Sequence, residues 1–522
     1  MEDVYDVVVV GGGVIGSACA RHLTLIQPDA KLAVVAPEEP TGSYAEHNGM
    51  FASHYDEGRV TRILDPNPVW ARLAKHSIAR YRDLEAESGI PFYHEAGYVC
   101  IGSEQHSAYL ERVQAVADAA SVTYDRLDAA QLHARFPAMP PADAPGQQAL
   151  RALAQTKDAG HISPRKMVQA QLRVCEQHGV HVVRDYATSV SFDADTNLAV
   201  VHLASSYSTT SPSSPPSSSS TTATTATATP PLRARKVVVA TGAFTTRELT
   251  DGVQVPLDVE GRTVVFADVT DMMQTAPDLQ LDRLPSVIKA ISSNADAKTE
   301  AEATKEKCDA QASHDTSTGA ATKASNADNA DETSARKQQQ QQQASEQATA
   351  ASQGGNSSTG MDSEQAGGND DDGDGNDGGG KGARGAGPCY DMYCLPPVKY
   401  GDGRWYIKIG TGDFPNKLPT LADVVAWFKG PPSKPDVAML TRELLALYPP
   451  LTACTMTTAN CVLTYTPHGY PVIDWVRSGV IAVAAGGNGA AAKSGDEIGR
   501  LAACFVSGQP DPTYDMATFA LP

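Results

Sequence analysis

The first predicted element is a buried strand at the start of the chain. Residues 5–10 end in four consecutive valines, a pattern typical of a parallel strand with both faces covered. Gly11, Gly13 and Gly16 follow, and the small residues of 17–23 then predict a helix. In this strand–turn–helix context, the glycines permit a tight turn, close approach of a diphosphate to the backbone, and close helix packing. The helix N-terminus would attract the diphosphate, although a glycine-rich turn without a ligand is the alternative.

Further apolar runs and helical periodicities predict a mixed α/β body. A stripe of apolar residues at helical spacing runs over 70–87, and Gly89 would end that helix. The other helices are predicted at residues 164–178 and 490–500, and strands at 31–35, 98–101, 180–183, 189–191, 199–201, 236–239 and 404–410.

Two segments have no such pattern. Residues 205–231 contain Ser, Thr, Ala and Pro with one Tyr and no charge. Residues 292–387 contain a run of six Gln, low-complexity tracts, and 17 acidic against 8 basic residues. Neither can bury enough apolar surface to offset the entropy of ordering it, so both are predicted to be disordered inserts.

Composition excludes several classes of partner. The net charge of −19 disfavours nucleic acid and anionic membranes, although about half of it lies on the longer insert. The chain has no apolar run long enough to span a bilayer and no recognisable targeting segment. Its nine cysteines are scattered without a C-x-x-C pair, which favours a reducing compartment and argues against a structural metal. A cytoplasmic protein without a metal site is therefore expected.

A second motif identifies the expected cofactor. The strand 236–239 runs into Ala240-Thr241-Gly242, a signature of proteins with two dinucleotide-binding folds that carry a flavin. Together with the N-terminal glycines it favours FAD over a nicotinamide cofactor. The acidic residue expected after the second strand, for the ribose hydroxyls, is assigned to Glu38, with a solvated loop glutamate as the alternative.

Four longer motifs carry a family resemblance. They are S-H-Y-D-E-G-R-V-T-R at 53–62, W-Y-I-K-I-G at 405–410, C-V-L-T-Y-T…V-I-D at 461–474, and A-G-G-N-G-A-A-A-K at 485–493. In sequence and order, the chain resembles the monomeric sarcosine oxidase branch of the D-amino-acid-oxidase-like flavoenzymes. These enzymes oxidise secondary or N-methyl amino acids with dioxygen to an imine and hydrogen peroxide.

The resemblance implies an α/β fold with two discontinuous domains. One is an FAD-binding domain of the GR2-type, Rossmann-like two-dinucleotide fold, and the other is an antiparallel-sheet substrate domain. The FAD-binding domain is expected at residues 1–90, 150–255 and 460–522, and the substrate domain at 91–149, 256–291 and 388–459.

The resemblance also assigns candidate substrate-binding cations. Arg62 is the expected fork for the substrate carboxylate, because a guanidinium matches a carboxylate in shape and charge. Lys493 would supply a second positive charge, and Arg59 would lie against the flavin. The alternative for the two arginines is solvated charge or an ion pair with Asp56 or Glu57.

Three further residues are assigned catalytic or covalent roles in the same way. Lys408 would activate dioxygen, unless it is a solvent-facing lysine on an edge strand. Tyr393 would cover the substrate, and Cys461 would form a thioether to the flavin, unless it is an ordinary core cysteine. The histidines His54, His161 and His468 are interpreted as structural, because hydride transfer from an unprotonated amine needs no base.

The expected FAD site combines the motif residues. Its expected members are Gly11, Gly13, Val14, Ile15, Gly16, Glu38, Ser53, Val190, Thr241, Gly242, Cys461, Gly486, Gly489 and Lys493. The helix over 490–500 would direct its N-terminus at the flavin ring that gains negative charge.

The sequence leaves two other functions open. Gly487 and Ala490 stand where the family has bulky residues, which predicts a roomier or re-lined pocket and puts sarcosine itself in doubt, so a sarcosine-like or a cyclic amino acid is the expected substrate. A dehydrogenase that passes electrons to a carrier would share the fold, and a flavin-bound assembly protein is a third possibility. Retention of Arg62, Lys408 and Lys493 argues against the assembly protein, which needs no substrate-binding cations.

Overall fold

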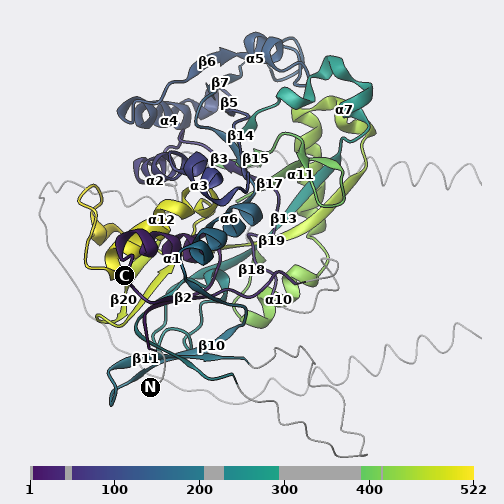
Figure 1. Cartoon of the computed structure of the whole chain (residues 1–522). Coiled ribbons are helices and arrows are strands. Elements are labelled where there is room, and N and C mark those ends of the chain that lie inside the picture. Colours follow the sequence, from purple (N-terminus) through teal and green to yellow (C-terminus); the bar gives the residue numbers. More distant parts are fainter. Residues whose placement is uncertain (1–3, 41–49, 148, 205–228, 293–388, 413–415) are drawn as a thin grey trace, which may run out of the picture. The chain divides into compact units, whose positions relative to one another are not determined.

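A computed structural model describes residues 4–40, 50–147, 149–204, 229–292, 389–412 and 416–522 (Figure 1). The two segments predicted to be disordered lie outside these residues, apart from their ends. Among the described residues, no helix is long and apolar enough to cross a membrane. The helices are α1 Val14–Ile26, α2 Pro68–Ile78, α3 Tyr81–Ser88, α4 Ser107–Ala119, α5 Ala129–Arg135, α6 Pro164–Gln177, α7 Met272–Thr275, α10 Leu421–Lys429, α11 Lys434–Leu447 and α12 Ala491–Val506.

The first large sheet has a parallel centre, as the valine-rich strands predict. β1 pairs in parallel with β2 and β12, and β2 with β9, while β12 also pairs in parallel with β21. The antiparallel strands β10, β11 and β20 extend the sheet. Its members are β1 Val4–Val10, β2 Leu32–Val35, β9 His181–Val183, β10 Ala187–Asp193, β11 Leu198–Leu203, β12 Leu232–Val239, β20 Val472–Arg477 and β21 Ile481–Ala485. The apolar side chains of β1 are buried between helices on one side and β10–β12 residues on the other.

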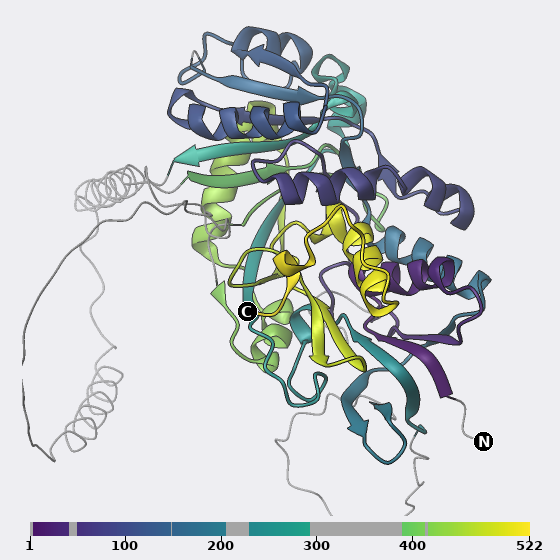
Figure 2. The same ribbon diagram turned by 90° about the vertical axis from the view of Figure 1, so that its left-hand side faces the viewer.

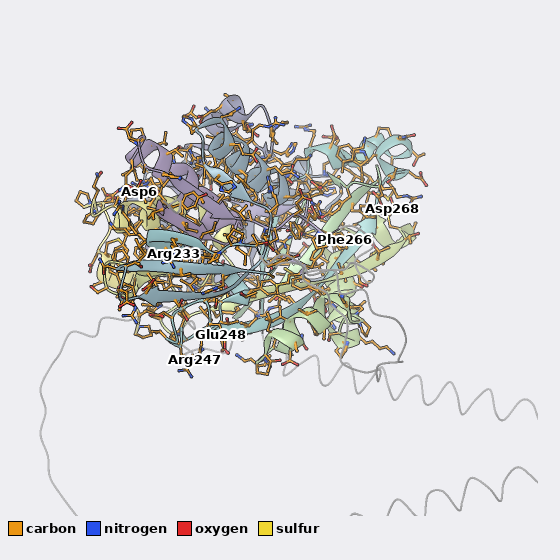
Figure 3. All side chains as sticks on the ribbon, turned by 60° about the horizontal axis from the view of Figure 1, so that its bottom comes forward. Asp6, Arg233, Arg247, Glu248, Phe266 and Asp268 are labelled. Atoms are coloured by element: carbon orange, nitrogen blue, oxygen red, sulfur yellow. The ribbon has the colours of Figure 1, made fainter. Side chains whose placement is uncertain are left out.

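The second large sheet is mostly antiparallel, with β14 and β5 as a parallel pair. Its members are β5 Tyr98–Gly102, β6 Asp125–Asp128, β7 Arg151–Gln155, β13 Asp258–Asp268, β14 Ser286–Ser292, β15 Cys389–Cys394, β16 Val398–Lys399, β17 Trp405–Thr411, β18 Asn416–Lys417 and β19 Met456–Tyr465. A small third sheet consists of β3 Arg59–Thr61, β4 Tyr93–His94 and β8 Gly160–Ile162. Figure 3 shows Asp6 and Arg233 in the first large sheet and Phe266 and Asp268 on β13 of the second.

These sheets confirm the predicted α/β fold class. The two-domain division stays a prediction, and the sheets divide the chain differently from it at two places. β7 and β19 both pair within the second large sheet, although residues 150–155 and 460–465 were assigned to the FAD-binding domain.

The N-terminal motif folds as its glycines predict. Gly11 has a φ of +106°, and a Cβ there would lie 2.5 Å from the carbonyl oxygen of Ala240 on the neighbouring strand end. A Cβ on Gly16 would overlap the carbonyl of Gly11. Only residues without side chains therefore allow α1 to begin this close to the ends of β1 and β12.

The helix predicted over 70–87 is two helices. α2 ends at Ile78 and α3 begins at Tyr81, and Gly89 ends α3 in a left-handed conformation, as expected. The Arg80 backbone N–H donates to the Ser77 carbonyl, which tightens the turn between the helices. The apolar stripe continues across this break, so periodicity alone does not reveal it.

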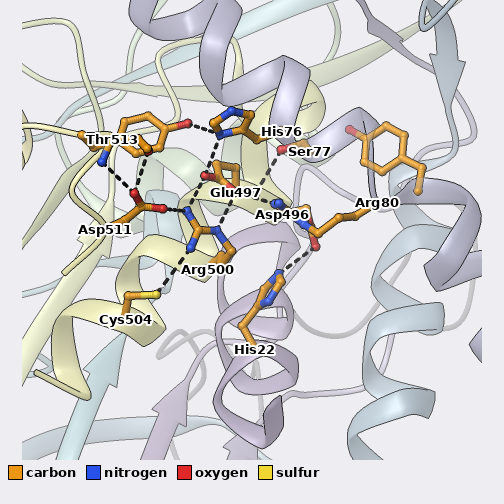
Figure 4. Close-up of polar contacts among 12 residues, drawn as sticks. His22, His76, Ser77, Arg80, Asp496, Glu497, Arg500, Cys504, Asp511 and Thr513 are labelled. Carbon is orange, nitrogen blue, oxygen red and sulfur yellow. Dashed lines mark hydrogen bonds and ion pairs between the residues drawn. The ribbon is translucent and has the colours of Figure 1, made fainter. Parts of the chain in front are cut away.

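A buried network of charges fixes α12 to the helices beside it (Figure 4). Asp496 accepts hydrogen bonds from Arg21 of α1 at 2.6 Å and from Arg80 at 2.7 Å. Glu497 accepts from Arg80 at 2.5 Å and from Arg500 at 2.7 and 2.8 Å. Figure 2 shows the C-terminal elements, in yellow, beside the N-terminal ones in purple. The network thereby fixes the helix that carries Lys493.

The longer insert enters and leaves the second sheet at adjacent points. Ser292 at the end of β14 and Cys389 at the start of β15 are cross-strand partners in an antiparallel pair. We expect that replacing residues 293–388 by a short Gly/Ser or Asn-Gly turn leaves folding and FAD content unchanged, because such a turn closes an antiparallel pair. Soluble yield, flavin-to-protein ratio and melting temperature measure this. Loss of soluble holoprotein would show that the insert contributes to the folded body.

Candidate active site

A cavity of about 490 Å³ lies at the carboxyl ends of β1, β2 and β12. The start of α1, the loop over residues 50–59, the strand β19 and the glycine-rich loop before α12 complete its wall. Such a crevice at the carboxyl ends of parallel strands is the usual ligand site of this architecture. Gly13 is the N-cap of α1 and the helix has no side-chain cap, so its first N–H groups are available to a diphosphate.

Most residues of the expected FAD site line this cavity. They are Gly11, Gly13, Val14, Ile15, Ser53, Thr241, Gly242, Cys461, Gly486 and Gly489. The combination of a glycine-rich turn, a free helix N-terminus and a mainly apolar wall fits the diphosphate and rings of FAD.

The other expected FAD residues lie elsewhere. Gly16 packs α1 against the strand ends, and Lys493 is not part of the cavity wall, although its sequence neighbour Ala492 is. Glu38 is exposed and is not part of the wall, whereas Ala36 and Pro37 are. Val190 is buried in the core of the first sheet, where its N–H donates to the Glu248 carbonyl. Roles of these residues toward FAD stay predictions.

Asp56 connects two of the expected active-site cations. Lys408 on β17 donates hydrogen bonds to Asp56 Oδ2 and to the Gly58 carbonyl, both at 2.6 Å. Arg59 forms an ion pair with the same oxygen, and the Tyr400 hydroxyl donates to Asp56 Oδ1 at 3.0 Å. An ion pair with Asp56 was one of the alternatives for the two arginines, and Arg59 forms this ion pair.

Lys408 is fully buried, so it is not the solvent-facing lysine that was the alternative. Burial, together with the positive charge of Arg59, lowers its pKa well below the usual value. The ion pair with Asp56 Oδ2 at 2.6 Å opposes this lowering, because it stabilises the charged ammonium. The site thus holds a fixed, buried lysine that shares Asp56 with Arg59 of the cavity wall.

Cys461 belongs to the wall of the cavity, and its covalent link to FAD stays a prediction. Its side chain lines the cavity, and its Sγ accepts a hydrogen bond from Arg59 at 3.3 Å. We expect acid precipitation to leave the flavin in the protein pellet and the Cys461→Ala variant to release it. Cys394 is also buried but does not line the cavity, so Cys394→Ala is the matched control. Flavin found wholly in the supernatant from the unmodified protein would contradict the thioether.

Arg62 and Lys493 converge on a third residue that the sequence did not single out. Arg62 Nη1 donates to Asp65 Oδ2 at 2.8 Å, and Lys493 Nζ binds the same oxygen. Burial and the Arg62 charge lower the pKa of Lys493 to about 8. Burial alone would raise the pKa of Asp65, but the two cations lower it to about 2. All three side chains are buried, and neither cation lines the cavity itself.

Tyr393 lies on β15 directly across from Gly410 of β17. A Cβ at Gly410 would meet the Tyr393 ring and hydroxyl within 3 Å, so the glycine leaves the space that the ring fills. Burial raises the pKa of Tyr393 to about 12, which keeps its hydroxyl protonated. Its role as a cover for the substrate stays a prediction.

Of the three histidines interpreted as structural, one is part of the cavity wall. His54 lines it, and burial with the charges of Arg165 and Arg59 lowers its pKa to about 3, so its ring is neutral. His161 is buried and stacks on His94, and His468 contacts Thr466 and Tyr470.

Comparisons with known proteins identify the family. The family model for FAD dependent oxidoreductases (DAO) matches residues 6–345, more than half of the chain. Monomeric sarcosine oxidase from Streptomyces avermitilis is 28% identical over 183 residues, which are 35% of this chain and 44% of that protein. The chain thus matches less than half the length of this relative.

Solved structures share the fold at low identity. NikD, an unusual amino acid oxidase essential for nikkomycin biosynthesis, is similar with a TM-score of 0.59, 15% identity, and coverage of 99% of this chain and 98% of that one. L-proline dehydrogenase from P. horikoshii is similar with a TM-score of 0.58, 12% identity, and coverage of 98% and 96%. With the family match and the lined cavity together, the chain belongs to the DAO family of FAD-dependent oxidoreductases.

Proposed function

We propose that this protein is an FAD-dependent oxidase of a secondary or N-methyl amino acid, which yields an imine and hydrogen peroxide. The observation that carries the proposal is the fully buried Lys408, held by Asp56 next to Arg59 of the cavity wall. A fixed positive charge in a site without water stabilises an anion that forms from dioxygen.

The chain's own residues bind and orient the substrate in this proposal. FAD bound in this cavity would supply the acceptor for a hydride from the carbon next to the amine nitrogen. Arg62 and Lys493 attract the carboxylate, and Tyr393 covers the amino acid. No side chain needs to act as a base, because the amine reacts in its unprotonated form. The substrate proposal is supported by the similarity to monomeric sarcosine oxidase, an enzyme named for its own substrate.

A dehydrogenase is the alternative with a specific observation in its favour. One of the similar structures is an L-proline dehydrogenase, so the fold accommodates either electron acceptor. An assembly protein that only binds flavin would have no need of a buried Lys408 and Arg62, each with its own aspartate.

Anaerobic titration of the purified holoprotein with N-methyl and cyclic amino acids tests the proposal. We expect loss of flavin absorbance with at least one of these compounds, followed by stoichiometric peroxide when air is admitted. Bleaching without peroxide, and rapid turnover with an artificial electron carrier, would support the dehydrogenase. Absence of bleaching across the panel would contradict both enzymes.

The carboxylate site makes a separate prediction. Arg62→Ala and Lys493→Ala should each lower kcat/KM for a carboxylated substrate by about a hundredfold, because either change leaves Asp65 less well neutralised, so that it repels the substrate carboxylate. FAD content should stay the same, since neither side chain lines the cavity. Arg72→Ala, at an exposed arginine of α2, is the control. Full activity of both variants would place the carboxylate elsewhere.

A further inference from the structure

The cations expected to bind a substrate carboxylate already share a carboxylate of this chain. Asp65 Oδ2 accepts from Arg62 Nη1 at 2.8 Å and also binds Lys493 Nζ. Arg62, Asp65 and Lys493 are 8%, 7% and 5% exposed, so solvent does not screen the three charges from one another. Asp65 therefore neutralises one of the two positive charges of Arg62 and Lys493, and one positive charge remains for a substrate carboxylate.

The backbone holds Asp65 in this position. Its Oδ1 accepts from the backbone N–H of Asn67, which caps α2. The two preceding residues, Ile63 and Leu64, donate their N–H groups to Gln155 Oε1 on β7, each at 3.1 Å. A substrate can consequently displace the Asp65 carboxylate from the cations only by turning the side chain, not by moving the loop.

Arg62 retains unused binding capacity. Asp65 accepts a hydrogen bond only from Nη1 of the guanidinium, so the bidentate contact typical of an arginine–carboxylate pair is not formed. Within the described part of the chain, the buried Arg62 Nε has no hydrogen-bond partner. The face of the guanidinium lies 5.1 Å from the Tyr98 ring centre, which holds its plane in place. A buried donor without a partner is unfavourable, so this arrangement favours a ligand that provides an acceptor.

We propose that Asp65 is a specificity-determining residue that competes with the substrate's carboxylate for Arg62 and Lys493. This inference rests on the proposed function and deepens it. Because Asp65 competes for the cations, the affinity for carboxylated amines is only slightly higher than the affinity for amines without a carboxylate. Its substrates accordingly include secondary amines whose carboxylate is absent or neutralised, as well as N-methyl amino acids.

The experiment compares the unmodified holoprotein with Asp65→Asn on a matched pair of amines, N-methylphenylalanine and N-methylphenethylamine. In the unmodified protein, loss of the carboxylate should cost less than about tenfold in kcat/KM. In Asp65→Asn, we expect preference for the carboxylated amine to rise on the order of tenfold to a hundredfold, the effect of a charged hydrogen bond. Asp83→Asn, at an exposed aspartate of α3, changes the net charge equally and should change nothing.

Acetate binding separates this inference from the proposed function. Perturbation of the flavin spectrum by acetate reports on the cations even if no amine is oxidised, and Asp65→Asn should bind acetate at least about tenfold more tightly. Equal or weaker acetate binding in Asp65→Asn would show that Asp65 only orients the cations and would overturn the inference. Asp65→Ser serves the same comparison if Asp65→Asn does not fold. A hundredfold preference of the unmodified protein for the carboxylated amine would overturn the inference without any variant.

Discussion

Replacing Lys408 with methionine is expected to slow the reaction of the reduced holoprotein with dioxygen by about a hundredfold to a thousandfold. This is the usual effect of removing one preorganised charge that stabilises a developing anion. Transfer of the first electron to dioxygen forms superoxide, an anion that the positive charge of Lys408 would stabilise. Reduction by substrate forms no such anion, so its anaerobic rate should stay near that of the unmodified protein. Stopped-flow absorbance of the flavin measures both steps separately.

Lys399→Met is the matched control for Lys408→Met. Lys399 is an exposed lysine on β16, the strand that pairs with β17, and it should show normal rates in both steps. Slow anaerobic reduction with unchanged reoxidation in Lys408→Met would assign Lys408 to substrate binding instead. Slow reoxidation in the unmodified protein would favour the dehydrogenase.

Replacing Asp496 with alanine is expected to destabilise the folded protein by about 3–5 kcal/mol. Asp496 is 1% exposed and neutralises Arg21 and Arg80, and removal of one partner leaves buried charges uncompensated. Thermal and urea unfolding of the holoprotein measure the change. Alanine at Glu111, an exposed acidic residue of α4, should leave the free energy of unfolding within about 0.5 kcal/mol. An equally small effect at Asp496 would show that the network is not needed for stability.

The same network predicts a direction of pH dependence. Burial alone would raise the pKa of both carboxyl groups, but neighbouring cations hold the pKa of Asp496 well below its usual value and that of Glu497 at about 2. Their ionised forms are therefore favoured more in the folded than in the unfolded protein. The resulting stabilisation is fully present above about pH 4.5 and is lost as the pH falls toward 2. Unfolding midpoints measured across this window should fall less steeply in Asp496→Asn, and equal slopes would contradict the assignment.

Short sequence patterns were sufficient to predict the parallel strands and several of the residues that line the cavity. The motif of Gly11, Gly13 and Gly16 depends on contacts between neighbouring parts of one strand–turn–helix unit, which sequence spacing determines. Thr241 and Gly242 line the cavity for a similar reason, because they follow directly from a buried strand. The fold class could therefore be predicted from the sequence, and several expected FAD residues line one cavity, while their contacts with FAD stay predictions.

Partners that come from distant elements could not be predicted in this way. Asp65 was not singled out because its contact with Lys493 joins residues 428 positions apart. Gln155 likewise supports the Asp65 loop from another sheet. The sequence offered one signal for Asp65. Arg62 and Lys493 were both expected in the substrate site, and two buried positive charges require a nearby anion. The break between α2 and α3 was missed because the apolar stripe continues through it.

The role of Asp56 as a shared partner has a consequence for any attempt to re-engineer the site. Lys408 and Arg59 bind the same carboxylate oxygen, so a change at one cation alters the electrostatic environment of the other. The effects of Lys408 and Arg59 substitutions will then not add, and the double variant will differ from the sum of the singles. In the proposed function, the dioxygen reaction and the flavin contact are therefore coupled through Asp56, and neither can be optimised alone.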